Sequence, residues 1–186
     1  MSLLAIYPEN GSDTPKLYNE RSDIIRTLKD HGVQFETWPA KHQVNDDSTQ
    51  EEILAAYHNE VNLLSLQYNF KSADVVSLTP GHPNAAEFRS KFISEHTHTD
   101  FEVRFFIDGS GLFYLHIGNQ VYALLCEKND LISVPANTPH WFDMGAKPFF
   151  KCIRMFSEPE GWVGHFTGSF ISEKFPDYDR FCKDFR

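Results

Sequence analysis

The hydrophobic pattern of the chain changes its period near Phe92. Before that residue, apolar side chains recur about every 3.6 positions in several segments, as they do in amphipathic helices. After it, apolar and polar residues alternate in short runs, which turn sequences such as Gly118-Asn119 and Lys128-Asn-Asp130 separate. Short alternating strands at close intervals are typical of β-barrels and β-sandwiches. We therefore expect a mainly β fold, with a few helices from the N-terminal half packed outside it.

The length and charge of the chain limit its organisation and its partners. At 186 residues, one domain is expected, with a mixed α/β part at 1–92, a β-barrel core at 93–170 and a surface tail at 171–186. The 17 Lys and Arg against 26 Asp and Glu give a net charge of −9, which disfavours nucleic acid and anionic membranes as partners. The 17 phenylalanines suit the interior of a β-barrel.

The cysteines and the N-terminal residues indicate where the protein works. Cys126, Cys152 and Cys182 are odd in number and far apart, so no disulfide framework is expected. The N-terminal residues include no basic leader, and no apolar run approaches the roughly 18 residues of a membrane span. We expect a cytoplasmic protein.

Helix-start signals recur in the N-terminal half. Ser22 is a plausible N-cap for a helix that ends before Gly32, and Ser48-Thr49-Gln50-Glu51-Glu52 offers a capping box in either of two registers. The apolar stripe after that box predicts the longest helix, and Pro83 begins a third one that extends towards Phe92.

The most informative segment for function lies at the start of the β region. Because side chains on a strand alternate between its two faces, His96, His98, Glu102 and Arg104 have the same parity and can point into one interior. Polar groups in a barrel interior are costly to bury unpaired, and a divalent ion held by two histidines and one carboxylate satisfies most of them. The alternative interpretation is a pair of exposed histidines next to a surface Glu102–Arg104 ion pair.

A second polar position follows later in the β region. In Pro135-Ala-Asn-Thr-Pro-His140, prolines precede a histidine at the start of the apolar run Trp141-Phe-Asp-Met144. Proline rigidity would fix the direction of His140. A histidine in such surroundings is commonly a core residue, but with the first segment it completes a set of three histidines and one carboxylate.

These two segments resemble the two motifs of the cupin superfamily, which implies a jelly-roll β-barrel. His96-x-His98-x₃-Glu102-x₆-Gly109 matches the first motif, and Asn129-x₅-Pro135-x-Asn137-x₂-His140 resembles the second. Asn stands at both places where the second motif usually has Gly. Asn tolerates the left-handed backbone conformation that Gly would supply. Ser90 and Met144 also depart from the motifs, so functions of germin-like cupins do not carry over.

The detailed match is with the acireductone dioxygenase family of methionine salvage. The matching strings cover nearly the whole chain and are densest over 89–168; they are Glu95-His-Thr-His98, Glu102-Val-Arg-Phe-Phe106, Gly109-x-Gly-Leu-Phe113, Leu115-His-Ile-Gly118, Glu127-Lys-Asn-Asp-Leu-Ile-Ser-Val-Pro135, Thr138-Pro-His-Trp-Phe-Asp-Met-Gly145 and Glu160-Gly-Trp162. The resemblance implies a metal-dependent dioxygenase with His96, His98, Glu102 and His140 as ligands of one ion.

Four protein ligands on an octahedral ion leave two positions, which a cis-enediolate can fill as a chelate. The donor set suits Fe²⁺ or Ni²⁺, and the sequence does not select between them. The family resemblance implies that the Fe form converts the acireductone and O₂ to formate and 4-methylthio-2-oxobutanoate. It implies that the Ni form gives formate, carbon monoxide and 3-methylthiopropionate.

The anionic substrate requires local cations and an apolar wall. Arg104 is the first candidate for substrate contact and Arg154 the second, with an ion-pair or surface role as the alternative for each. The candidates for the wall around the methylthio tail, each of which can also be plain core, are Phe92, Phe106, Phe142 and Trp162. The sequence identifies no catalytic base, and we expect a monomer.

Two other functions remain open from sequence alone. The first is another metal-dependent cupin enzyme, such as a different dioxygenase or an isomerase. The second is a non-enzymatic cupin that binds a small ligand. Oxygen uptake with an acireductone after loading with Fe²⁺ distinguishes these alternatives from an acireductone dioxygenase.

Overall fold

A computed structural model describes residues 1–11, 14–158 and 163–186. The strands are β1 (Leu3–Pro8), β2 (Lys16–Tyr18), β3 (Gln34–Thr37), β4 (Ser72–Leu78), β5 (His96–Thr97), β6 (Glu102–Ile117), β7 (Gln120–Glu127), β8 (Asp130–Val134), β9 (His140–Asp143), β10 (Phe150–Phe156) and β11 (His165–Phe166). The helices are α1 (Arg21–Lys29), α2 (Gln50–Ala56), α3 (His58–Tyr68), α4 (Ala85–Phe92), the 3₁₀ turn Ile171–Lys174 and α5 (Tyr178–Phe185).

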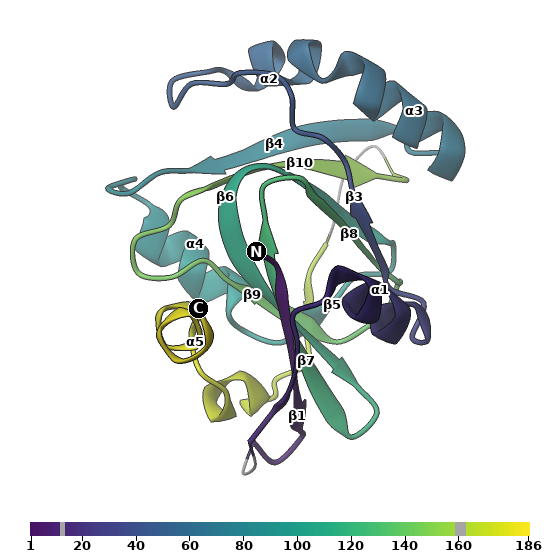
Figure 1. Cartoon of the computed structure of the whole chain (residues 1–186). Coiled ribbons are helices and arrows are strands. Elements are labelled where there is room, and N and C mark those ends of the chain that lie inside the picture. The colour runs from purple at the N-terminus through teal and green to yellow at the C-terminus, as the bar shows by residue number, and fades with distance from the viewer. Residues whose placement is uncertain (12–13, 159–162) are drawn as a thin grey trace.

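Strand β6 belongs to both layers of the fold and joins them (Figure 1). Its first half pairs with β8 and β10, in a layer with the order β4-β10-β6-β8-β3. Its second half pairs with β7 and β9, in a layer with the order β11-β5-β9-β6-β7-β1-β2. Among the described strands, hydrogen bonds do not close the layers into a ring. The mainly β, cupin-like prediction is confirmed, as two curved layers with a jelly-roll arrangement.

Aromatic and aliphatic side chains fill the space between the layers. The largest buried cluster draws residues from both sheets, and Phe106, Phe113 and Phe142 lie at its centre with no more than 1% of their surface exposed. Their ring centroids are 4.9 to 6.4 Å apart, within the range of favourable aromatic contacts. Most of the phenylalanines are buried in this way, whereas Phe101, Phe149, Phe166 and Phe170 are exposed.

The N-terminal helices lie outside the sheets, as the sequence predicts. Helices α2 and α3 cover the outer side of β4 and β10 (Figure 1). The predicted capping box is present: Glu52 N–H donates to the Thr49 hydroxyl and Thr49 N–H donates to the Glu52 carboxylate. The prediction of one long helix is wrong, because the helix is interrupted at Tyr57, whose ring is buried against Phe105. Ser22 is not the N-cap of α1; Glu20 occupies that position.

Three predicted turn conformations are confirmed. Gly118 has φ = 62° in the turn between β6 and β7. Asn129 and Asn137, which replace the usual glycines of the second cupin motif, have φ values of 79° and 61°. Asn is among the non-glycine residues that adopt this left-handed region most readily.

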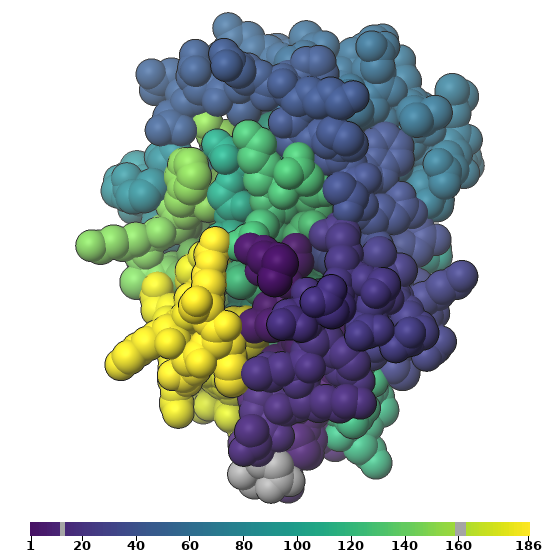
Figure 2. Space-filling model, viewed as in Figure 1, coloured from purple at the N-terminus to yellow at the C-terminus, as the bar shows by residue number. Residues whose placement is uncertain are grey.

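The C-terminal tail, which the sequence predicts to lie on the surface, forms a helix that packs against the rest of the fold. Asp177 caps α5 by accepting a hydrogen bond from Arg180 N–H. Phe181 is fully buried in a cluster that also contains Tyr7 of β1 and Trp141 of β9. Figure 2 shows the two ends of the chain side by side on one face. Packing against β1 and β9 therefore fixes the tail.

Two further expectations concern the cysteines and the membrane. All three cysteines are free, as predicted. Within the described ranges, no helix has the length and the apolar character needed to cross a membrane.

Candidate metal centre

The four predicted ligands lie together, at the place where the two layers meet. The potential ligand atoms of His96, His98, Glu102 and His140 are all within 4.8 Å of one another, and all four residues are buried. His96 and His140 are register partners on β5 and β9 in one layer, whereas Glu102 begins β6 in the other. The four residues thus converge as predicted, but not from one face of a single strand, because residues 98–101 separate β5 from β6.

The backbone fixes which nitrogen of each histidine faces the cluster. In each case Nδ1 donates to a main-chain oxygen: His96 to Ser94 at 2.7 Å, His98 to Val163 at 2.9 Å and His140 to Thr138 at 2.7 Å. A carbonyl oxygen only accepts hydrogen bonds, so Nδ1 carries the proton of each neutral ring. The Nε2 lone pairs then remain to bind a metal ion, and this arrangement is usual for metal-binding histidines.

Glu102 and His140 provide the clearest evidence that a cation fits here. Oε2 of Glu102 and Nε2 of His140 are 2.5 Å apart and inaccessible to solvent, and Nε2 of His98 lies 3.4 Å from the same carboxylate oxygen. Burial disfavours the charged state of both groups, yet their mutual attraction raises the pKa of His140. The positive charges of Arg104 and His140 hold the pKa of Glu102 well below its usual range, despite its burial. A proton and a metal ion therefore compete for the same place.

His96 is held in the neutral form that a metal ligand requires. Burial and the positive charge of His140 lower the pKa of His96 to about 4. At neutral pH its ring therefore carries no proton on Nε2, and this is the state in which imidazole binds a divalent ion.

Arg104 is buried next to the cluster. Its Nε donates to Oε1 of Glu102 at 2.7 Å, which leaves Oε2 of that carboxylate facing the histidines. The guanidinium carbon lies 4.7 Å from the ring centroid of Phe142 and 5.7 Å from that of Phe92. The ion pair that was the alternative to substrate contact is thus present, and it orients the carboxylate.

A cavity of about 160 Å³ lies against the cluster. Its described lining residues are Lys91, Phe92, His96, His98, Arg104, Arg154, Gly164 and Phe166. Both predicted arginines line this cavity. Arg154 is the register partner of Arg104 on the adjacent strand β10, and it makes a bidentate ion pair with Asp74 at 2.7 and 2.5 Å.

The predicted apolar wall is placed unevenly. Phe92 lines the cavity, whereas Phe106 and Phe142 lie within the core between the layers. Trp162 lies outside the described residues. Sequence reasoning missed Lys91 and Phe166, because α4 and β11 reach the cavity only through the tertiary fold.

A buried carboxylate that the sequence did not identify holds β11 near the cluster. Glu95 accepts a hydrogen bond from His116 Nδ1 at 2.8 Å and another from the Thr167 hydroxyl at 2.6 Å. Thr167 N–H also donates to the carbonyl of Glu95 at 3.1 Å. These bonds fix the segment that contains Val163, whose carbonyl orients His98.

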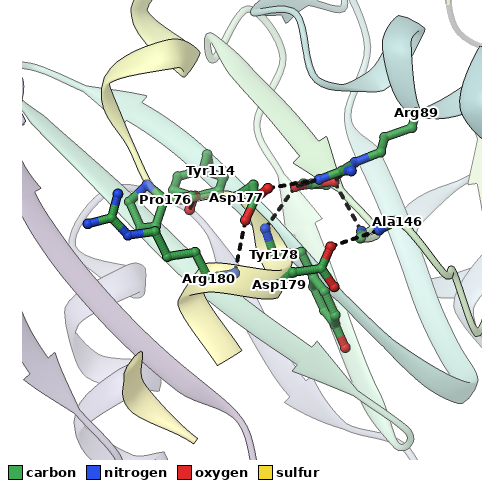
Figure 3. A network of polar contacts seen from close by, with 10 residues as sticks. Arg89, Tyr114, Ala146, Pro176, Asp177, Tyr178, Asp179 and Arg180 are labelled. Carbon is green, nitrogen blue, oxygen red and sulfur yellow. Dashed lines mark hydrogen bonds and ion pairs between the residues drawn. The ribbon is translucent and has the colours of Figure 1, made fainter. Parts of the chain in front are cut away.

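A second polar network links α4, β9 and α5 (Figure 3). Arg89 of α4 donates to both carboxylate oxygens of Asp143 on β9, at 2.6 and 2.8 Å. Asp143 also accepts from the N–H groups of Gly145 and Tyr178, while Ala146 N–H donates to Asp179. Helix α4, which contributes Lys91 and Phe92 to the cavity, is thereby fixed to the strand that begins with His140.

This fold and this donor set define the class, a cupin-type metalloenzyme with a buried centre of three histidines and one carboxylate. The sequence profile of the ARD/ARD′ family matches residues 4–164. The chain therefore belongs to this family, the acireductone dioxygenases, which are oxidoreductases.

Individual relatives agree with this assignment. The chain is 52% identical to acireductone dioxygenase of Methylococcus capsulatus over 100% of both chains. It is 54% identical to the acireductone dioxygenase of a Hydrogenobaculum species, over 96% of this chain and 97% of the relative. A solved structure of acireductone dioxygenase from Bacillus anthracis, with a cadmium ion in its active centre, superposes with a TM-score of 0.79. The two sequences are 30% identical, and the match covers 89% of this chain and 98% of the relative's chain.

Proposed function

We propose that this chain cleaves 1,2-dihydroxy-3-keto-5-methylthiopentene, an acireductone of methionine salvage, with O₂, and that His96, His98, Glu102 and His140 hold one Fe²⁺ or Ni²⁺ ion. The products are formate with 4-methylthio-2-oxobutanoate in the Fe form, and formate, carbon monoxide and 3-methylthiopropionate in the Ni form. The observation that carries the proposal is the convergence of three carbonyl-oriented histidines on a buried carboxylate, in a chain that belongs to this family.

The donor set fits a divalent transition metal. Three imidazole nitrogens and one carboxylate suit iron or nickel, and an octahedral ion keeps two further positions for a chelating substrate. When bound, the ion supplies positive charge to the enediolate oxygens and a redox partner for the chemistry with O₂. The cadmium ion of the Bacillus anthracis relative supports a divalent ion at the corresponding centre.

The residues of the chain prepare the site for an anion. Arg104 and Arg154 lie directly opposite each other on β6 and β10, an arrangement of like charges that destabilises a sheet unless something offsets it. Glu102 and Asp74 offset part of that charge, and an anionic substrate in the cavity would offset more. Phe92 lines the same cavity and offers an apolar surface for the methylthio tail.

The chain is further proposed to act as a single-domain monomer. Size-exclusion chromatography with light scattering tests this. A stable dimer whose disruption abolishes activity would contradict it.

The test of the proposed function uses protein purified without chelators. After reloading with Fe²⁺ or Ni²⁺, we expect about one ion per chain and O₂ consumption when the acireductone is added. Product analysis should find carbon monoxide only with the Ni form. Protein that binds one ion per chain but consumes no O₂ would favour a different metal-dependent cupin enzyme or a ligand-binding cupin.

A further inference from the structure

Three of the described cavity residues are cationic, and their partners differ. Arg104 is paired with buried Glu102, and Arg154 makes two hydrogen bonds with Asp74. Lys91 pairs with Glu87, one turn earlier on α4, at 2.7 Å. The side chains of Lys91 and Glu87 are 59% and 60% exposed, so this ion pair is in contact with solvent.

These pairs differ in how easily they exchange partners. A bidentate Arg–carboxylate pair or a buried ion pair holds its groups in one geometry, because separation leaves a charge without compensation. An exposed i, i+4 pair between two flexible side chains contributes little, because water solvates both groups when they separate. Lys91 is therefore the cavity-lining cation that can leave its carboxylate at the smallest cost.

The position of Lys91 is nevertheless well defined at the level of the backbone. Arg89, two residues earlier, is fixed to Asp143 of β9, and the ring of Phe92 packs 6.4 Å from that of Phe142. The backbone of α4 is therefore held in place at the cavity wall, while the long side chain of Lys91 can change the position of its ammonium group.

We infer that Lys91 is a substrate-binding residue, which exchanges Glu87 for the anionic oxygens of the acireductone. This inference rests on the proposed function. The chain has a net charge of −9, which opposes the approach of an anion, and a solvated cation at the cavity provides local attraction. Before the substrate binds, the ammonium group of Lys91 stays paired with the carboxylate of Glu87.

The experiment measures substrate binding separately from oxygen chemistry. The Ni-loaded protein is titrated anaerobically with the acireductone, at low and at high salt, for wild type, Lys91→Ala, Lys91→Arg and Glu87→Gln. Lys183→Ala on α5 is the matched control, because it removes the same charge from another exposed helix position. Metal stoichiometry is measured on every preparation.

We expect Lys91→Ala to raise Kd by roughly 5- to 15-fold at low salt, the effect of one lost charge-assisted contact in a partly exposed site. The loss should shrink in about 1 M salt, where the Debye length falls to about 3 Å. Lys91→Arg should bind within about 3-fold of wild type, because it keeps the charge. Glu87→Gln should bind at least as tightly as wild type, because it releases the ammonium.

Three outcomes would overturn the inference: a Kd of Lys91→Ala equal to that of wild type, a loss no larger than that of Lys183→Ala, or equal losses in Lys91→Ala and Glu87→Gln. The last result would show that the ion pair supports the helix and nothing more. Failure of wild-type, metal-loaded protein to bind the acireductone would instead contradict the proposed function. The two failures are therefore distinguishable.

Discussion

The floor and the rim of the cavity are built in opposite ways. The floor is the buried cluster against which the cavity lies, and no more than 8% of any of its residues is exposed; it consists of His96, His98, Glu102, Arg104 and His140. The rim consists of Lys91 and Phe166; Phe166 is 62% exposed, and Lys91 is also exposed. Floor residues hold one another in place, whereas the rim side chains reach into solvent.

This difference separates two tasks. Removing a floor group leaves a buried partner unsatisfied, which costs far more than the contact itself contributes. Water replaces a lost contact at the rim. Variants of the floor should therefore lose metal and chemistry, while rim variants should change substrate binding by modest factors.

The largest effect is expected at His140. His140→Ala removes a metal donor and opens a water position, so metal content and turnover should fall together. Since changes outside the ligand sphere already cost 10–100-fold, the loss of a ligand should exceed about 100-fold in kcat/KM. Metal analysis and kinetics on one preparation test this. His58→Ala, at an exposed position on α3, is the control. Full metal content and turnover in His140→Ala would show that His140 is not a metal ligand.

Arg104→Ala should have the next largest effect. The loss of a charge-assisted contact in a buried site costs about 2–3 kcal/mol, or roughly 30–150-fold in kcat/KM. Metal content should fall less than in His140→Ala, because Arg104 orients Glu102 but is no ligand. Kinetics, metal stoichiometry and thermal midpoint are measured together. If missing metal explained the whole loss of activity, Arg104 would only orient Glu102 and would not contact the substrate.

Asp143 joins the floor to the rim, and its loss should affect stability. Burial acts to raise the pKa of Asp143, but hydrogen bonds from Arg89 and from backbone N–H groups outweigh it, and the pKa is lowered. Asp143→Ala leaves Arg89 without this partner and should cost about 2–3 kcal/mol of unfolding free energy. Denaturant unfolding of both proteins at neutral pH measures the difference.

The same lowered pKa gives this stabilisation a pH dependence. Because the folded-state pKa lies below the unfolded one, the contribution is complete above the unfolded value of about 3.9. It is lost as pH falls through the folded-state pKa. The stability difference between wild type and Asp143→Ala should therefore shrink only in strong acid. A difference that disappears near neutral pH would show that another group is responsible.

The smallest effect is expected from Thr167→Val, which removes one hydroxyl at almost constant volume. Glu95 loses one hydrogen bond, so the segment that orients His98 is held less firmly. At about 1 kcal/mol for one bond, metal affinity should weaken by roughly 5-fold in a chelator competition. A loss of metal affinity above about 100-fold would show that this segment matters for metal binding as much as the floor residues do. That result would contradict the distinction between floor and rim.

Sequence reasoning succeeded where a local rule decides the outcome. The prediction that His96, His98 and Glu102 converge is confirmed, although they do not share one strand: residues 98–101 leave the strand conformation, and His96 and Glu102 lie on β5 and β6. The tolerance of Asn for positive φ explained two departures from the cupin motif, at Asn129 and Asn137. The inference for Asn129 and Asn137 depends only on the residue type and needs no knowledge of the tertiary fold.

It failed where distant contacts decide. Tyr178, Phe181, Cys182 and Phe185 have helical spacing after the capping residue Asp177, but aromatic residues favour helices weakly. Contacts with β1 and β9 stabilise this helix, and local sequence does not reveal them. Lys91 was missed for a related reason, because its position at the cavity depends on where α4 lies relative to β5. Tyr57 interrupts a predicted helix, and its ring packs against Phe105 of the distant strand β6.

The placement of the four donors in two layers has a thermodynamic consequence. Because β6 contributes Glu102 from one layer while β5 and β9 contribute histidines from the other, an ion bound by all four ties the sheets together. Affinity for the ion and resistance to unfolding then become one linked quantity: saturation at 100 times Kd adds about 2.7 kcal/mol to the stability of the folded state. A chelator that strips the ion should loosen the whole sandwich, and substitutions far from the cavity that shift one sheet against the other should alter metal loading.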